Sequence, residues 1–164
     1  MIRIESLGND RVRRVLALQR STRRRLRDDL MVAEGHRLVS ELVDAPVDLV
    51  EVFVTEAYVS GEPDAAALAS RLAGRAEVIE VTDAVMAEMS DTVTPQGVLA
   101  VLRIPDLAPA VDPIYGRFIL IPDQVRDPGN LGTMLRTAWA AGVTQVLLPP
   151  GTVDPAASRG LPAG

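Results

Sequence analysis

The sequence predicts an α/β fold, and three observations support this class. Short apolar or β-branched runs alternate with helix-length segments from residue 30 to residue 104. Apolar residues make up 48% of the 164-residue chain, and the mean hydropathy is +0.17, which favours a folded core over disorder. A strand–loop–helix–strand pattern at 117–149 predicts a βαβ unit. We therefore expect a largely parallel or mixed sheet, followed by a separate βαβ unit.

The individual elements follow from the spacing of the apolar residues. We expect strands at 30–33, 47–56, 76–82, 97–104, 117–122 and 145–149, and helices at 9–29 (one or two helices), 34–45, 63–74, 82–91 and 130–141. Thr82 or Asp83 is the expected N-cap of one helix, and Asn130 is the expected N-cap of the last. In that last helix, Leu131 and Trp139 belong to a stripe that should face the core.

A proline-rich segment divides the chain. The stretch "PDLAPAVDP" at 105–113 contains three prolines and predicts a linker. We therefore predict a first domain at 1–104, a linker at 105–116 and a second unit at 117–164.

Charge is distributed unevenly along the chain. The net charge is −5, yet residues 1–37 hold ten arginines against five acidic residues, a local balance of +5. The rest of the chain holds seven arginines against seventeen acidic residues, a balance of −10. This asymmetry predicts a basic N-terminal arm on an acidic body. Arginine is well suited to phosphate because its planar guanidinium binds two oxygens at once.

Composition also excludes several kinds of site. There is no cysteine and one histidine, His36, so disulfides and a zinc site are not expected. No apolar run reaches the roughly 18 residues that span a bilayer, and the N-terminus lacks the apolar core of a secretory signal. We expect a cytoplasmic protein with no metal and no membrane partner. Aromatic residues make up only 3% of the chain, which argues against base stacking as the main mode of binding.

The arginine-rich run within residues 20–27 is a candidate surface for RNA phosphates. Its members are Arg20, Arg23, Arg24, Arg25 and Arg27. The alternative is an ordinary solvated helix face. Glu34 and Arg37 are either a structural pair between strand and helix or part of RNA binding, and His36 is expected to be a surface or structural residue.

The loop and helix at 123–141 carry the second candidate site. Asn130 and Arg136 lie near the carboxyl end of a predicted strand, where open α/β sheets usually bind ligands. The alternative makes Asn130 only a cap and Arg136 only a surface residue, with Asp127 pairing with Arg126 or favouring the helix dipole. The loop matches neither phosphate-cradling glycine motif, and no nucleophile–base set is apparent, so a small-molecule α/β enzyme is poorly supported.

Three separated motifs resemble SpoU-type (TrmH-like) RNA ribose methyltransferases. "DPGNLGTMLRTAWAAG" resembles the first signature motif of that family, "TVTPQGVLAVL" (92–102) resembles the segment that closes its substrate-binding domain, and "SLGNDRVRRVLALQRSTRRRLRDDLMVAEGHRLVSEL" (6–42) resembles the opening of that domain. The motifs occur in the family's order and cover nearly the whole chain to about residue 155.

The resemblance implies both a fold and an activity. The implied fold is a ribosomal-protein-like α/β substrate-binding domain followed by the first part of a SPOUT-type knotted α/β methyltransferase domain. The implied activity is transfer of a methyl group from S-adenosylmethionine to a ribose 2′-hydroxyl of rRNA or tRNA by a homodimer. The family's motif Asn and Arg fall on Asn130 and Arg136, the implied catalytic residues. We add Arg37 and Arg126 to the arginines expected to bind RNA.

The chain departs from the family at its C-terminal end. The segment "GTVDPAASRGLPAG" is not followed by the Gly-x-Glu and Ser/Asn segments that build most of the family's cofactor pocket and its knot. We therefore expect a truncated methyltransferase that binds S-adenosylmethionine weakly or not at all. The alternative from another class is a non-catalytic RNA-binding module of ribosomal-protein type, which would share the basic arm and the first domain.

Overall fold

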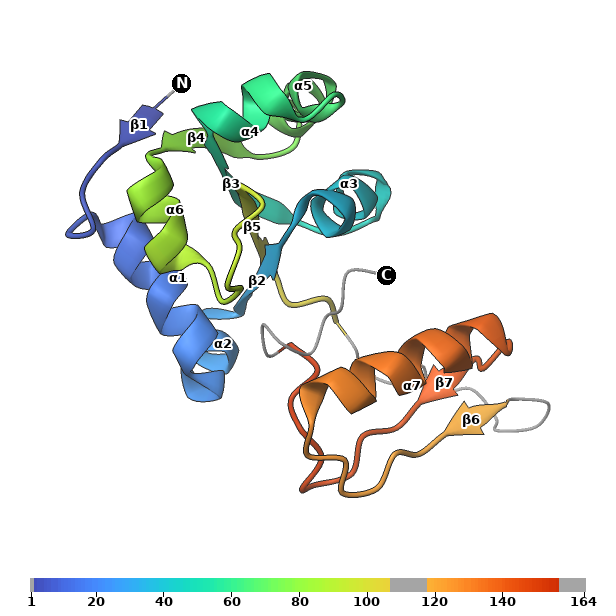
Figure 1. Ribbon diagram of the computed structural model, residues 1–164. Helices are drawn as coiled ribbons and strands as arrows, with labels where there is room; N and C mark the ends of the chain where they lie inside the picture. The colour runs from blue at the N-terminus through green and yellow to red at the C-terminus, as the bar shows by residue number, and fades with distance from the viewer. Residues whose placement is uncertain (1, 107–117, 157–164) are drawn as a thin grey trace. The chain divides into compact units, whose positions relative to one another are not determined.

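The computed structural model describes residues 2–106 and 118–156, which form two compact units dividing at Pro105 (Figure 1). Most of the expected linker, from residue 107, and the tail from residue 157 lie outside the described residues. Within the described residues, no helix is long and apolar enough to cross a membrane.

The first unit is built on a mixed five-stranded sheet with the strand order β1-β4-β3-β5-β2. The strands are β1 (Ile2–Ile4), β2 (Leu30–Glu34), β3 (Leu49–Thr55), β4 (Glu77–Val81) and β5 (Val98–Arg103). Strands β1, β4 and β3 run parallel, and β5 runs antiparallel to both β3 and β2. The expected α/β class with a mixed sheet is confirmed. Strand β1 was not predicted, because only three residues pair and only Ile4 among them is buried.

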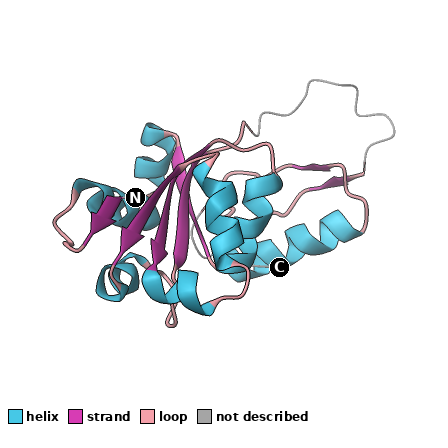
Figure 2. Ribbon diagram, turned by 90° about the horizontal axis from the view of Figure 1, so that it is seen from above, coloured by secondary structure: helices cyan, strands magenta, loops and turns pink. Residues whose placement is uncertain are grey.

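Helices cover both faces of this sheet (Figure 2). They are α1 (Asp10–Arg20), α2 (Thr22–Asp28), α3 (His36–Asp44), α4 (Glu56–Gly61), α5 (Ala65–Ala73) and α6 (Asp83–Met89). Helices α1 and α6 lie on one face, while α3 and α5 lie on the other (Figure 1). Strands β2, β3 and β5 are almost completely buried and almost continuously apolar. The α1–α6 side holds the main core, which includes Val12, Val15, Leu18, Phe53, Ile79, Met86 and Leu99.

Threonine caps define two of the helix starts. The Thr82 hydroxyl accepts a hydrogen bond from the backbone N–H of Val85, which confirms the predicted cap of α6. Thr55 ends strand β3 and caps α4 through the N–H of Tyr58, at 3.1 Å. Helix α4 was not predicted, because the apolar pattern extended the strand to residue 56 and the next helix was expected to begin at residue 63.

Glu34, at the end of β2, holds the segment that precedes β5. Its carboxylate accepts hydrogen bonds from the Ser90 hydroxyl, from the Asp91 backbone N–H at 3.1 Å and from the Thr92 hydroxyl at 2.9 Å. The two motif segments that resemble the start and the end of one family domain therefore meet in space.

The predicted alternative of a Glu34–Arg37 pair is wrong. Glu34 is committed to the residue 90–92 segment, and Arg37 instead bonds Glu41 one helical turn later, at 3.3 Å. His36 is half-buried and plays a structural part, because its ring Nδ1 lies 2.6 Å from the Tyr58 hydroxyl and its backbone N–H donates to the Gln96 side chain.

The second unit contains a βαβ arrangement, as predicted. Strands β6 (Ile119–Leu120) and β7 (Gln145–Val146) pair in parallel and are joined through α7 (Pro128–Ala140). The paired strands are much shorter than the runs predicted from the sequence.

Two predictions for α7 are wrong. The N-cap is Asp127, whose carboxylate accepts from the backbone N–H of Asn130 at 2.8 Å, so Asn130 lies inside the first turn. Trp139 is 84% exposed, whereas Leu131 and Ala138 are buried. Seven residues make nearly two full turns, so position 138 returns to the face of Leu131, while position 139 lies about 80° away from it.

The backbone at Gly97 leads to a stability prediction. Gly97 has φ +78°, and a Cβ added there would lie 2.7 Å from both Thr55 Oγ1 and Tyr58 Cβ. We expect Gly97→Ala to lower the free energy of unfolding by about 2–3 kcal/mol. Backbone strain at a positive φ and steric overlap of the new Cβ with Thr55 and Tyr58 both destabilise the folded state. The matched control is Gly61→Ala, where an added Cβ meets nothing within 4 Å. Equal urea midpoints for the two variants would contradict the expectation.

Tyr58 leads to a pH prediction. Burial, with a smaller contribution from nearby Glu62, raises the pKa of Tyr58 to about 12. The folded state therefore holds the phenol proton more tightly than the unfolded state, whose pKa is about 10. Stability from this group is complete below pH 10 and is lost as the pH rises through 12. We expect the unfolding midpoint of the wild type to fall more steeply between about pH 10 and about pH 12 than that of Tyr58→Phe. Parallel plots of the two midpoints against pH would contradict this expectation.

Candidate nucleic-acid interface

Helices α1 and α2 form a basic hairpin on the first unit. Asn9 caps α1 through the N–H of Arg11 at 2.9 Å, and Ser21 caps α2 through the N–H of Arg24 at 3.2 Å. Val12, Val15 and Leu18 point into the core, which leaves most of the arginines on the outer faces of the hairpin. The apolar stripe of α1 thus fixes which way the charged side chains point.

Arg25 is the exception, and the prediction that it contacts RNA is wrong. Its side chain is only 3% exposed. The guanidinium donates to the carbonyl oxygens of Leu18 at 2.6 Å and Gln19 at 3.3 Å, and to the Thr22 hydroxyl at 2.8 Å. Arg25 therefore ties α2 to the end of α1 and satisfies carbonyls that the helix terminus leaves open.

The other predicted arginines of the hairpin face solvent to different degrees. Arg20 and Arg23 are both exposed. Arg24 and Arg27 both form ion pairs with Asp28, and Arg27 Nε lies 3.0 Å from Asp28 Oδ1. The hydrogen bond from Arg27, aided by that from Arg24, holds the pKa of Asp28 below its usual value. Asp28 therefore stays ionised and orients two of the cations.

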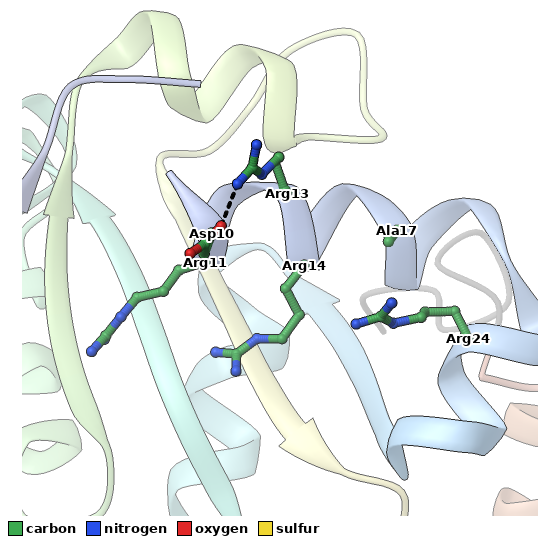
Figure 3. A pocket seen from close by; sticks show the side chains of 6 residues that line it. All are labelled: Asp10, Arg11, Arg13, Arg14, Ala17 and Arg24. Carbon is green, nitrogen blue, oxygen red and sulfur yellow. Dashed lines mark hydrogen bonds and ion pairs between the residues drawn. The ribbon is translucent and has the colours of Figure 1, made fainter. Parts of the chain in front are cut away.

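A hollow of about 390 Å³ lies between α1 and α2 (Figure 3). It is lined by Asp10, Arg11, Arg13, Arg14, Ala17 and Arg24. Figure 3 shows the side chain of Arg24 extending from α2 toward Arg14 on α1, while the Arg14 guanidinium points away from Arg24 and Arg13 turns to Asp10. Four of the six lining residues are arginines, which makes the hollow a candidate anion site.

A buried carboxylate orients two of the lining arginines. Glu51, in β3, is only 5% exposed and bonds both Arg14 and Arg11, in the case of Arg11 at 3.1 Å. Arg11 also bonds Glu77 at 2.7 Å, and this hydrogen bond is the main cause that raises the pKa of the Arg11 guanidinium. The Nε–H of Arg14 is buried without an acceptor among the described residues.

Arg11, Arg13 and Arg14 were not predicted, because the density of arginines at 20–27 drew the prediction there. A usable signal was present: Arg11 and Arg14 are three residues apart and so share one side of an amphipathic helix. Arg37 lies on α3, which covers the opposite face of the sheet from α1, so the structure does not bring it to the hairpin.

The second candidate site lies on the second unit. Asn130 and Arg136 lie on α7, and Arg126 lies in the preceding loop. Six positions along a helix separate the two motif residues by about 9 Å along the axis and by about 120° around it. The helix therefore does not place Asn130 and Arg136 in direct contact, so any shared substrate must bridge them.

A second hollow, of about 340 Å³, lies against α7 and is almost wholly apolar. Its lining includes Phe118, Leu120, Met134, Ala138 and Val143. S-adenosylmethionine carries a sulfonium, an ammonium and a carboxylate, all of which need polar partners when they are bound. The hollow does not fit that cofactor. Among the described residues there is also no cluster of His, Cys, Asp and Glu that could hold a metal ion.

Most of the first unit matches a known family of domains. Residues 9–100 match the MRM3-like substrate binding domain. The chain is 32% identical over 154 residues to the 23S rRNA (guanosine(2553)-2′-O)-methyltransferase RlmP of Bacillus subtilis, covering 94% of this chain and 57% of that protein. It is 33% identical over 163 residues to the human mitochondrial rRNA methyltransferase 3, covering 96% of this chain and 37% of that protein.

Solved structures of rRNA methyltransferases also resemble this chain. An AdoMet-bound rRNA methyltransferase from Sinorhizobium meliloti superposes with a TM-score of 0.77 at 27% identity, covering 97% of this chain and 58% of that one. The chain thus spans a little over half of these bacterial relatives. It belongs to the MRM3-like substrate-binding domain family and is a homologue of the SpoU/TrmH-family rRNA 2′-O-methyltransferases.

Proposed function

We propose that this chain provides the RNA-binding part, and the start of the catalytic part, of an S-adenosylmethionine-dependent rRNA 2′-O-ribose methyltransferase. The observation that carries the proposal is the basic α1–α2 hairpin inside a segment that matches a substrate-binding domain. Exposed arginines on one hairpin suit a phosphate backbone, which carries its charge at regular intervals.

Arg20, Arg23, Arg24 and Arg27 would make the main contacts with RNA phosphates, because all four belong to the hairpin and none of them is buried. Arg37 and Arg126 would contact other parts of a long RNA. We further propose the finer fold that the resemblance implies, in which a ribosomal-protein-like domain precedes a SPOUT-type methyltransferase domain. The proposed domains are 1–104 and 117–164, joined by 105–116, and the proposed functional assembly is a homodimer.

Arg136 and Asn130 would act on the ribose and its phosphate. A ribose hydroxyl is a weak nucleophile that must be aligned and must lose its proton. A guanidinium stays protonated, so Arg136 is better suited to binding the adjacent phosphate and stabilising the developing alkoxide than to accepting a proton. Asn130, more than one turn away, would hold the RNA backbone on the other side.

We propose that most of the S-adenosylmethionine site lies outside this chain. The apolar hollow against α7 does not fit S-adenosylmethionine, so we derive no step through it. The relatives are longer than the matched region, and we propose that the remaining cofactor contacts lie in their further length. The relatives include bacterial and mitochondrial proteins, and we propose the bacterial-type cytoplasmic location.

The alternative function is a non-catalytic RNA-binding module of ribosomal-protein type. Its support is that the family match ends at residue 100, within the first unit. Such a module has no need of α7 and its neighbouring strands.

Arg136 separates the two functions. In a protein that carries this chain and continues to the length of its relatives, we expect Arg136→Ala to lower the rate of methyl transfer to rRNA by about 10²-fold or more. RNA affinity should change by less than about threefold, because the hairpin supplies most phosphate contacts. Tritium transfer from labelled S-adenosylmethionine measures the rate. Full activity of the variant would exclude this role for Arg136.

The hairpin gives a paired prediction on binding and stability. The double variant Arg20→Gln/Arg23→Gln should weaken RNA binding, because it removes two cations that face solvent. The slope of log affinity against log salt should fall by roughly 0.7 for each phosphate that is no longer neutralised. The urea midpoint should stay unchanged, because both side chains are exposed.

Arg25→Met is the matched variant with the opposite expected profile. It should lower the free energy of unfolding by about 1–3 kcal/mol, because buried carbonyls lose their donors. The slope of its log affinity against log salt should match that of the wild type. A stable Arg25→Met protein with a reduced slope would reverse the roles assigned to these arginines.

A further inference from the structure

The hollow between α1 and α2 has features of a specific anion site beyond a general basic surface. Its cationic groups come from two helices, and both Arg14 of α1 and Arg24 of α2 line it, with Arg24 extending toward Arg14 (Figure 3). Ala17 also lines the hollow, with a side chain too small to fill the space. Asp10 is the one acidic residue among the six that line the hollow, and Arg13 already bonds it.

Arg14 and Arg24 are each held in place by a carboxylate, but each keeps N–H donors that this carboxylate does not use. Arg14 is tied to the buried Glu51, and Arg24 is tied to Asp28. A guanidinium carries five N–H donors, whereas each of these carboxylates offers only two oxygens. The side chains of Arg14 and Arg24 are 30% and 38% exposed, so part of each remains open to solvent. Prior orientation lowers the entropy lost when an anion binds.

The size and chemistry of the hollow favour a phosphodiester. Its volume equals that of about a dozen water molecules, which leaves room for a phosphate and parts of its two riboses. Two guanidinium planes can each donate a pair of hydrogen bonds to phosphate oxygens. Arg20 and Arg23 are also exposed on the hairpin and supply further positive charge for a polymer with repeated charges. A ligand with a single carboxylate would have no second charge to pair with these additional arginines.

We propose that this hollow holds one phosphodiester of the substrate RNA, clamped between Arg14 and Arg24, and that Glu51 is a positioning residue for Arg14 and Arg11. The proposal rests on the proposed RNA-binding function and names the site at which one phosphate is fixed. Arg24 is then a specific contact, whereas Arg20 and Arg23 contribute mainly through their charge.

The test uses the full chain and a fluorescein-labelled, single-stranded RNA of mixed sequence, titrated at a series of KCl concentrations around physiological ionic strength. We expect Arg24→Gln to raise the Kd about fivefold to tenfold and to lower the salt slope by roughly 0.7, the value for one neutralised phosphate. The charge-matched control is Arg71→Gln, which removes an exposed arginine of α5 that pairs with Asp44. Its Kd should stay within about twofold of the wild type, with the same slope.

Arg24→Lys separates a clamp from a diffuse positive field. Lysine keeps the charge but cannot form the planar pair of hydrogen bonds. A clamp predicts that its salt slope stays near the wild-type value while its Kd rises about threefold or more. Wild-type affinity in both Arg24→Lys and Arg24→Gln would overturn the proposal.

A second readout does not depend on affinity. Arg14→Gln would leave Glu51 with one partner fewer and can unfold the chain, so Arg14 is better followed by nuclear magnetic resonance. In ¹⁵N-labelled protein we expect the Nε–H signals of Arg14 and Arg24 to shift as the same RNA is added, with Arg71 unmoved. Static signals at both residues during saturating binding would contradict the clamp.

The possible results distinguish this proposal from the function on which it rests. If the wild type does not bind the RNA, both the proposed RNA-binding function and the clamp are wrong. If binding depends on Arg20 and Arg23 but not on Arg24, the proposed function stands and the clamp is wrong. If a polyglutamate peptide competes as well as unlabelled RNA does, the hollow is a general anion site, and the assignment to a phosphodiester is overturned.

Discussion

The ion pairs of Glu51 with Arg11 and Arg14 join the core of the first unit to its basic surface. Glu51 lies in β3, a central strand, where a lone carboxylate would be costly to bury. Two guanidinium groups from α1 compensate for that cost, and they can reach it only if α1 lies across the sheet as observed. Removing both arginines would leave the Glu51 carboxylate buried without a cation, which is unfavourable. The same interaction therefore secures the helix and orients two of the arginines that line the hollow.

The remaining architecture supports this arrangement from the other side. Val12, Val15 and Leu18 fix the rotation of α1, and Arg25 fastens α2 against the end of α1. Glu34 and Gln96 fasten the residue 90–97 segment to the start of α3, so the two motif regions form one structural joint. The first unit is therefore a packed sheet that presents a charged hairpin on one of its faces.

Much of the fold could be predicted, because its signals are local. Alternating apolar runs identified four of the five strands of the first sheet, and Thr82 was recognised as a cap. Trp139 was misplaced because a spacing of four was extended over eight residues, where the helix has turned too far. Strand β1 was missed because its pairing with β4 joins residues more than seventy positions apart.

The site was predicted only in part for a similar reason. Density of arginine identified the hairpin, but density alone cannot separate the buried Arg25 from the exposed Arg23. The importance of Arg11 and Arg14 depends on Glu51, which comes from a distant strand. Pairing across long sequence separations is the information that a local pattern lacks. For Asn130 and Arg136, the resemblance to a family carries the assignment, and it stays a prediction.

We expect RNA to lie on the α1–α2 hairpin. Photo-crosslinking of the chain to rRNA containing 4-thiouridine, followed by mass spectrometry of the linked peptides, would show which residues contact the RNA. We predict that the linked peptides come chiefly from residues 10–28, with weaker linkage near Arg126. Crosslinks confined to α3 and α5, on the opposite face of the sheet, would contradict it.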